Sequence, residues 1–234
     1  MKFDVKVSEG GGSSRQPAAP PHGRARRNGA AGEHNTRMET REWLTAVVGY
    51  ALGSVLPAEI LARRRLRASM RSLGDNPGGA GAWRKLGPSA AVVVASFDVA
   101  KGALAAWLAR RVATSLEGFV LVCVSPVAGH NWPVYLLFRG GRGLAPAAGV
   151  LLVLATGPAV VSLGLGALLA LRTRWAPTVG IVGLPLYVAL LVAWQHPPRE
   201  VAAAIAVTLT VAVRQLPWVW ERLREVKRRL SACA

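Results

Sequence analysis

Apolar residues are grouped in long blocks along this chain, and most charged residues lie between the blocks. The helices of water-soluble proteins carry their apolar residues in a stripe along one face, whereas these blocks are apolar on all sides. A helix that crosses a bilayer needs about 20 apolar residues. The pattern therefore predicts membrane-spanning helices, at 43–62, 88–108, 118–138, 144–171, 177–194 and 201–213.

The block 144–171 decides the number of spans, because its 28 residues without a charge form either one tilted helix or two short helices broken near Gly157 and Pro158. Lys and Arg concentrate on the cytoplasmic side of membrane proteins. With seven spans, 17 of the 29 Lys and Arg lie on one side and three in the opposite loops. With six spans, the basic C-terminal tail would lie outside. We therefore predict an all-α polytopic membrane protein of about seven helices, some short, with the N-terminus outside and the C-terminus cytoplasmic.

The two ends of the chain differ from this membrane domain, which we place at 43–219. Residues 1–40 are rich in Gly, Pro and Arg, which predicts a disordered basic tail without the apolar stretch of a cleavable signal peptide. Residues 220–234 are predicted to form a basic cytoplasmic tail on anionic lipid headgroups. A soluble all-helical core is the alternative, although buried soluble helices rarely run uncharged for so long.

Composition narrows the possible partners. The net charge is +17 and 52% of residues are apolar, which excludes disorder of the whole chain. The two cysteines, Cys123 and Cys233, do not make a disulfide framework or a zinc signature. No basic fold with interleaved aromatic residues is visible, so nucleic acid is not an expected partner. We expect membrane lipids as the surroundings, no metal, no cofactor and a monomeric chain.

A few polar residues lie inside the apolar blocks, where charge is costly and usually faces the protein interior or a water path. Asp98 and Lys101 are three residues apart, so they share one helix face and can neutralise each other. A structural ion pair and a functional role both remain open. His130 and Asn131 lie just before Pro133 in the third block, where a single His is often only a packing residue.

Two glycine-rich runs follow predicted spans and lie on the same side in the seven-span arrangement. The first, 72–84, is flanked by Arg71 and Arg84, and the second ends in Arg139-Gly140-Gly141-Arg142-Gly143. Open backbone amides together with arginine side chains suit a phosphate group. Tight glycine turns with positive-inside arginines are the structural alternative. Two such loops indicate a ligand that is anionic at one end. The membrane setting indicates that the other end of this ligand, or its partner, is apolar.

These residues resemble the motifs of the bacterial acyl-phosphate:glycerol-3-phosphate acyltransferase family (PlsY) over roughly 43–230. The family's first motif has Gly-Ser in span one and Asn-Pro-Gly followed by Arg after the next loop. It also has Phe-Asp-x-x-Lys-Gly in span two, and then Gly-His-x-(Trp/Phe)-Pro-Val before Lys-Gly-Gly-Lys-Gly. The matching residues are Gly53-Ser54, Asn76-Pro77-Gly78, Arg84, Phe97–Gly102 and Gly129–Gly143, with Arg at both lysines of the last motif.

The chain departs from the family pattern in places that matter for activity. Gly-Ser-Gly before Asn76 is Leu-Gly-Asp, and Ala-Thr-Asn after Gly78 is Gly-Ala-Gly. The family's third motif, Arg-His-x-x-Asn, reads Arg-Gln-Leu-Pro-Trp at 214–218, so Gln215 and Trp218 replace residues that belong to the family's active site.

The resemblance implies transfer of a fatty acyl group from acyl phosphate to glycerol 3-phosphate, which gives lysophosphatidic acid at the cytoplasmic face of the bacterial plasma membrane, without metal. It implies catalytic roles for Lys101, His130, Arg139, Arg142 and Ser54. It further implies phosphate binding by Arg71, Asn76, Gly78, Arg84, Gly140, Gly141 and Gly143, with Asp98 as a structural brace. A catalytically impaired or substrate-divergent lipid- or phosphate-binding paralogue is the alternative. A transporter is a weaker alternative, since no internal repeat is visible.

Overall fold

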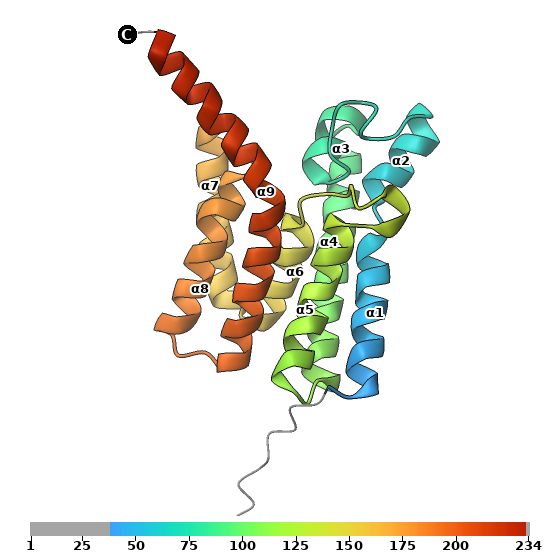
Figure 1. Ribbon diagram of the computed structural model, residues 1–234, viewed down its shortest axis with the longest axis vertical. Coiled ribbons are helices and arrows are strands. Elements are labelled where there is room, and N and C mark those ends of the chain that lie inside the picture. The colour runs from blue at the N-terminus through green and yellow to red at the C-terminus, as the bar shows by residue number, and fades with distance from the viewer. Residues whose placement is uncertain (1–37, 233–234) are drawn as a thin grey trace, which may run out of the picture. The chain divides into compact units, whose positions relative to one another are not determined.

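Each apolar block of the sequence is helical in the computed structural model, which describes residues 38–232 (Figure 1). No β-strand occurs among those residues, so the predicted all-α fold is confirmed for them. The elements in chain order are α1 (Thr40–Ser54), α2 (Pro57–Leu66), α3 (Gly79–Leu86), α4 (Pro88–Val112), α5 (Leu116–Asn131), η1 (Val134–Leu136), α6 (Leu144–Leu154), α7 (Thr156–Thr173), η2 (Val179–Gly183), α8 (Leu184–Ala193) and α9 (Pro198–Ala232).

Five helical segments within 38–232 are long and apolar enough to cross a membrane: Thr40–Leu66, Pro88–Val112, Leu116–Leu136, Thr156–Thr173 and Pro198–Glu225. Two shorter apolar helices, Leu144–Leu154 and Val179–Ala193, complete the bundle. At 1.5 Å per residue, the first of these is only about 16 Å long, roughly half of a bilayer core of about 30 Å. The helices are those of a membrane protein, and the count of seven spans stays a prediction.

The predicted break in the block 144–171 is present, but it falls at Ala155, two residues earlier than expected. Ala155 is extended, with φ −156° and ψ 104°, and it separates α6 from α7. Pro158 lies in the first turn of α7, where its missing N–H leaves no helix hydrogen bond unmade. The proline therefore begins the second helix rather than ending the first.

Helix α9 is longer than the predicted apolar block 201–213. It runs from Pro198 to Ala232 and includes Pro217, so the domain boundary predicted at 220 lies inside a continuous helix. Of the predicted disordered tail 1–40, only 38–40 belong to the described residues, and the rest of that prediction lies outside them.

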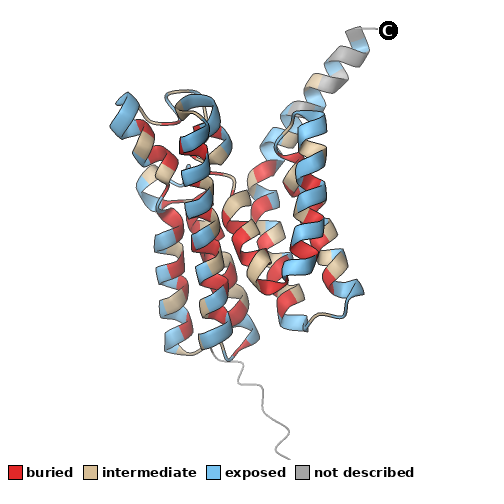
Figure 2. Cartoon of the chain, turned by 180° about the vertical axis from the view of Figure 1, so that it is seen from behind, coloured by how far each residue is buried: buried red, intermediate tan, exposed pale blue. Residues whose placement is uncertain are grey.

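Glycines bring the helix backbones into direct contact on one side of the bundle. A Cβ atom at Gly53 or Gly129 would collide with the facing backbone where α1 packs against α5. The same holds for Gly102 and Gly149, where α4 packs against α6. Small residues of this kind replace the hydrophobic effect as the basis of helix packing in lipid. Buried residues accordingly line the faces that the helices turn to one another (Figure 2).

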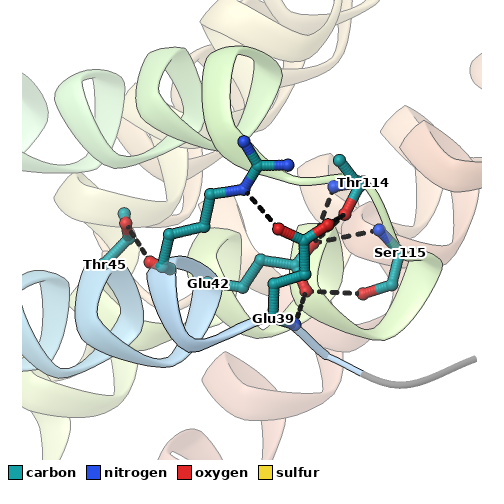
Figure 3. Close-up of polar contacts among 6 residues, drawn as sticks. Glu39, Glu42, Thr45, Thr114 and Ser115 are labelled. Atoms are coloured by element: carbon teal, nitrogen blue, oxygen red, sulfur yellow. Dashed lines mark hydrogen bonds and ion pairs between the residues drawn. The ribbon is translucent and has the colours of Figure 1, made fainter. Parts of the chain in front are cut away.

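One end of the bundle is fixed by a buried carboxylate. Glu42, at the start of α1, accepts hydrogen bonds from Thr114 N at 2.6 Å, Ser115 N at 3.0 Å and Ser115 Oγ at 2.9 Å (Figure 3). It also accepts from Thr114 Oγ1 at 3.3 Å and from the amide of Glu39 at 2.9 Å. These bonds tie α1 to the turn between α4 and α5. The loops that are rich in glycine lie at the opposite end, beside α2 and α3 (Figure 1).

Candidate active site

Two adjoining pockets lie where the loop after α2, the loop after α5 and helix α9 meet. The first has a volume of about 280 Å³ and is lined by Arg71, Gly74, Asp75, Asn76, Arg84, Arg142 and Trp218. The second measures about 160 Å³ and is lined by Asn76, Gly78, Gly79, Ala80, Gly81, Arg84, Asp98, His130, Arg142, Gly143, Leu144, Ala145 and Ala176. Asn76, Arg84 and Arg142 belong to both, so the pockets form one basic site.

Arg84 is held in the site by a two-point ion pair. Its Nε and Nη2 donate to Asp75 Oδ2 at 2.8 Å and Oδ1 at 2.6 Å. Burial alone would raise the pKa of the Asp75 carboxyl, but the hydrogen bonds from Arg84 and from the Asn76 amide hold that pKa below its usual value. The pair fixes the orientation of a guanidinium at the pocket wall without consuming all five of its donors.

Arg142 connects the two glycine-rich loops and α9. Its Nε and Nη2 donate to the side-chain oxygen of Asn76 at 3.0 Å and 2.8 Å when that oxygen faces the guanidinium. The guanidinium carbon lies 4.1 Å from the centroid of the Trp218 ring. Burial and the nearby positive charge of Arg84 lower the pKa of Arg142. Arg84 is paired with one carboxylate, and the partners of Arg142 described above are an amide and an aromatic ring. The excess positive charge of these two arginines favours an anionic ligand in the pockets.

Below the pockets, Asp98, Lys101 and His130 form a buried charged cluster. Lys101 Nζ lies 2.8 Å from Asp98 Oδ1 and donates to the carbonyls of Gly53 at 2.8 Å and Val55 at 3.0 Å. His130 Nδ1 is 3.2 Å from Lys101 Nζ and 3.4 Å from Asp98 Oδ1. The predicted face shared by Asp98 and Lys101 is therefore confirmed, and it meets the predicted His130.

The opposite edge of the His130 ring faces the second pocket. A Cβ atom at Gly141 would collide with Nε2 of this ring, and a Cβ atom at Gly78 would lie 4.0 Å from the same atom. His130 itself is 2% exposed and lines the pocket. The imidazole thus spans from the Asp98–Lys101 pair to the space between the two glycine-rich loops.

The expectation that the glycine amides are open is wrong for four positions, the first of which is Gly74, whose N donates to Arg71 O at 2.9 Å. Gly140 N donates to Asn131 O at 3.1 Å, and Gly141 N donates to His130 O at 2.9 Å. Gly78 N donates to the carbonyl of Asn76 at 2.9 Å. A side chain at Gly140 would collide with the end of α5 and with Pro133, and one at Gly141 would collide with the His130 ring, so close packing is one reason for these glycines. The amides of the first turn of α3, which lines the second pocket, are the open ones, as at any helix N-terminus.

Other predicted residues are less central. Arg71 lines the first pocket and its Nη1 donates to the Arg139 carbonyl at 3.3 Å, but the exposed Arg139 side chain lines neither pocket. Ser54 donates its hydroxyl to the Tyr50 carbonyl at 2.9 Å and also lines neither pocket. Gly143 begins α6 with a φ of +72° at the pocket edge.

Two residues of α9 belong to the site although the sequence motifs did not assign them a role in it. Arg214 donates from Nε to the Gly141 carbonyl at 3.1 Å and from Nη2 to the Gly140 carbonyl at 3.2 Å. Trp218 lines the first pocket beside Arg142. The run 214–218 resembles a degenerate third motif of the family, and its arginine is the signal in the sequence that places this helix at the glycine loop.

Fold and site together define an integral membrane protein with a basic pocket above a buried Asp–Lys–His cluster. The crystal structure of PlsY (YgiH), an integral membrane glycerol 3-phosphate acyltransferase in its glycerol 3-phosphate form, superposes with a TM-score of 0.72. The superposition covers 79% of this chain and 93% of that chain at 24% sequence identity. This likeness concerns the fold.

The sequence comparisons identify the family. The family model for glycerol-3-phosphate acyltransferase matches residues 43–228. Glycerol-3-phosphate acyltransferase 5 of Dehalococcoides mccartyi is 37% identical over 145 residues, which span 61% of this chain and 62% of that relative. Glycerol-3-phosphate acyltransferase 4 of the same strain is 37% identical over 172 residues, 73% of this chain and 92% of the relative. The enzyme of Pseudomonas putida KT2440 is 32% identical over 72% of this chain and 89% of its own. The chain belongs to the glycerol-3-phosphate acyltransferase family.

Proposed function

We propose that this chain transfers a fatty acyl group from acyl phosphate to the 1-hydroxyl of glycerol 3-phosphate, giving lysophosphatidic acid and phosphate. The observation that supports this most directly is the basic double pocket, which joins Arg84 and Arg142 to the buried His130 cluster at one end of a membrane bundle. Both substrates carry phosphate, and both phosphates require positive groups that water does not screen.

The two pockets differ in a way that suggests how the substrates divide between them. The first holds Arg71, Arg84 and Arg142 around a mainly polar space, which suits the water-soluble glycerol 3-phosphate. The second is more apolar and reaches Asp98 and His130, which suits the activated end of an acyl phosphate. Its phosphate would meet the open amides of the first turn of α3. Arg142, shared by both pockets, would contact both anions.

The reaction needs little more than position and charge stabilisation, because phosphate is a good leaving group. The glycerol hydroxyl oxygen attacks the acyl carbonyl carbon, and the bond from that carbon to the phosphate oxygen breaks. Arg142 and the α3 amides stabilise the charge that develops on the departing phosphate. The hydroxyl proton is accepted by a base and passes to the released phosphate.

His130 is suited to be that base. Lys101 Nζ donates to Gly53 O and Val55 O, and its third proton would go to Asp98 Oδ1 at 2.8 Å in preference to His130 Nδ1 at 3.2 Å. In that arrangement a neutral His130 would direct its Nδ1 proton to Asp98 Oδ1, 3.4 Å away, and the Nε2 lone pair would face the pocket. Lys101 and Asp98 would orient the imidazole, and Arg214 would hold the loop of Gly140 and Gly141. Ser54, whose hydroxyl donates to the Tyr50 carbonyl, would have no direct contact with the substrates.

The fold also supports a topology. We place the site at the cytoplasmic face of a bacterial plasma membrane, with seven spans, the N-terminus outside and the C-terminus inside. The five long apolar segments and two shorter ones agree with that number, and the positive-inside rule agrees with the orientation. Membrane lipids surround the bundle, and a monomer contains the whole site.

The proposal is tested with membranes that contain the protein, palmitoyl phosphate and labelled glycerol 3-phosphate. Lysophosphatidic acid should form together with an equal amount of phosphate, and membranes with Arg142→Ala should form little of either. Equal product from both membranes would contradict the proposal. Failure of the unaltered protein to form product, with retained binding of glycerol 3-phosphate, would instead support the lipid- or phosphate-binding alternative.

A further inference from the structure

A third pocket lies beside α9, between this helix and the segment η2–α8. It measures about 220 Å³ and is lined mainly by aliphatic residues, together with Gly180, Thr208 and Gln215. The described lining contains no charged side chain. An apolar pocket of this size is large enough for part of an alkyl chain, since a cavity of about 150 Å³ accommodates benzene.

Two polar groups inside this pocket have no partner. Both Oε1 and Nε2 of Gln215 are buried without a hydrogen bond among the described residues, and the residue is 3% exposed. Oγ1 of Thr208 is buried and unpartnered in the same way. The two residues are seven positions apart on α9, about 10 Å along one face of the helix. A buried amide or hydroxyl without a partner is costly, which points to a ligand that satisfies them.

The chemistry of these groups restricts the ligand. An amide and a hydroxyl each donate and accept hydrogen bonds but bear no charge, so a phosphate or carboxylate would be buried there without a counter-charge. An alkyl chain that bears a hydroxyl group fits the apolar walls and can satisfy unpartnered atoms of Gln215 or of Thr208, depending on where along the chain the hydroxyl lies. A plain alkyl chain fits the walls alone and leaves Gln215 unsatisfied.

The third pocket adjoins the catalytic pockets. A Cβ atom at Gly180 would lie within 3.0 Å of the Gln215 Oε1 atom and of Leu144 Cδ2, so the three residues meet at one point. Leu144 lines the second pocket, where the acyl phosphate is placed in the proposed function. A chain that leaves that pocket past Leu144 would reach Gln215.

We propose that the pocket between η2–α8 and α9 binds the acyl chain of the substrate and selects hydroxylated fatty acyl chains through Gln215 and Thr208. This specificity rests on the proposed acyltransferase function. A site that is built to hydrogen-bond a hydroxyl discriminates against the analogue that lacks it, because its own polar groups then stay unpaired.

The turnover experiment compares matched acyl phosphates in purified protein: β-hydroxypalmitoyl with palmitoyl, and ricinoleoyl with oleoyl. At least one hydroxylated chain should have a kcat/KM about tenfold higher than its parent, the effect of one satisfied hydrogen bond. Gln215→Leu should remove or reverse this preference and Thr208→Val should reduce it. Thr210→Val is the matched control, since its hydroxyl already donates to the Ala206 carbonyl at 2.7 Å.

A binding experiment separates this inference from the proposed function. Methyl ricinoleate and methyl oleate are titrated into the purified protein and into Gln215→Leu, and bound ester is counted by native mass spectrometry. Tighter binding of the hydroxylated ester that Gln215→Leu abolishes supports the inference even if no acyl transfer is seen. Equal binding of both esters, or a preference that survives Gln215→Leu, overturns it even if the enzyme is fully active with palmitoyl phosphate.

Discussion

The guanidinium of Arg142 lies 4.1 Å from the ring centroid of Trp218. Trp218 stands at the position where the family's third motif has asparagine. Asn76 contacts the same guanidinium through its side-chain oxygen. Arg142 is thus held by a stacking contact and a hydrogen bond, and no carboxylate is among these two partners. Its charge remains available for an anion in either pocket.

Replacement of Trp218 should therefore weaken substrate binding more than chemistry. We expect Trp218→Leu to raise the KM for glycerol 3-phosphate about two- to fivefold with a small change in kcat, since a cation–π contact at an exposed site contributes about 0.5–1 kcal/mol. Trp218→Phe should retain most of the affinity. The exposed Trp220 of the same helix is the control, and equal effects of Trp220→Leu and Trp218→Leu would count against the role of the Arg142 contact.

The two arginines of the second glycine loop should differ in importance. Arg142 lines both pockets, whereas the exposed Arg139 side chain lines neither. We expect Arg142→Lys to lower kcat/KM at least tenfold, because lysine cannot keep the forked contact to Asn76 and the stacking contact together. Arg139→Lys should change kcat/KM less than threefold. Steady-state kinetics with both substrates measure the difference, and the reverse order of effects would refute this placement of the loop.

The free energy of unfolding should depend on Asp98 and Lys101 jointly, because each neutralises the charge of the other. Lys101→Met leaves the Asp98 carboxylate as an uncompensated buried charge, which typically costs about 3–5 kcal/mol. The double variant Asp98→Asn with Lys101→Met should recover much of that loss. Thermal unfolding in detergent checks the order, and both variants should be nearly inactive because His130 loses its orientation. A double variant less stable than Lys101→Met would contradict the ion-pair account.

The pair Asp75–Arg84 predicts a pH dependence of stability. Because the pKa of Asp75 is lower in the folded protein than in the unfolded chain, its contribution is fully present above the unfolded pKa of about 3.9. It is lost as the pH falls through the folded value. We expect the difference in melting temperature between the unaltered protein and Asp75→Asn to be constant from pH 8 to about pH 5 and to shrink only in stronger acid. A difference that vanishes already near neutral pH would show that another group is responsible.

Glu42 should contribute to stability without contributing to catalysis. Glu42→Ala leaves the part-buried amide of Thr114 and the buried amide of Ser115 without their acceptor, which should lower the free energy of unfolding by about 2–4 kcal/mol. The kcat of the folded fraction should be unchanged, because this network lies at the end of the bundle opposite α2 and α3 (Figure 1), and none of its residues lines either pocket. The exposed Glu117 of the adjacent turn is the matched control, and Glu117→Ala should have little effect on either quantity.

The sequence predicts the helices and the membership of the site better than it predicts what each residue does there. The spacing of Asp98 and Lys101 is sufficient to place them on one helix face, and the high glycine content of the two loops is sufficient to identify them. Hydrogen bonding within the loops is not visible in composition, so the amides of Gly140 and Gly141 were expected to be open although neighbouring carbonyls accept their hydrogens. The position of Trp218 beside Arg142 depends on how far α9 extends, and its apolar pattern ends near 213.

The close contact of α4 with α6, at Gly102 and Gly149, has an evolutionary consequence. Any side chain at these glycines would force the helices apart and shift both Lys101 and the start of α6. Substitutions at these glycines would therefore abolish activity, and selection would eliminate them. The wall made by η2, α8 and α9 includes a π-helix, and the close glycine contact at its pocket is between Gly180 and the side chain of Gln215 rather than between two helix backbones. New acyl preferences within the family should therefore arise by substitutions in that wall, while the reaction chemistry is inherited unchanged.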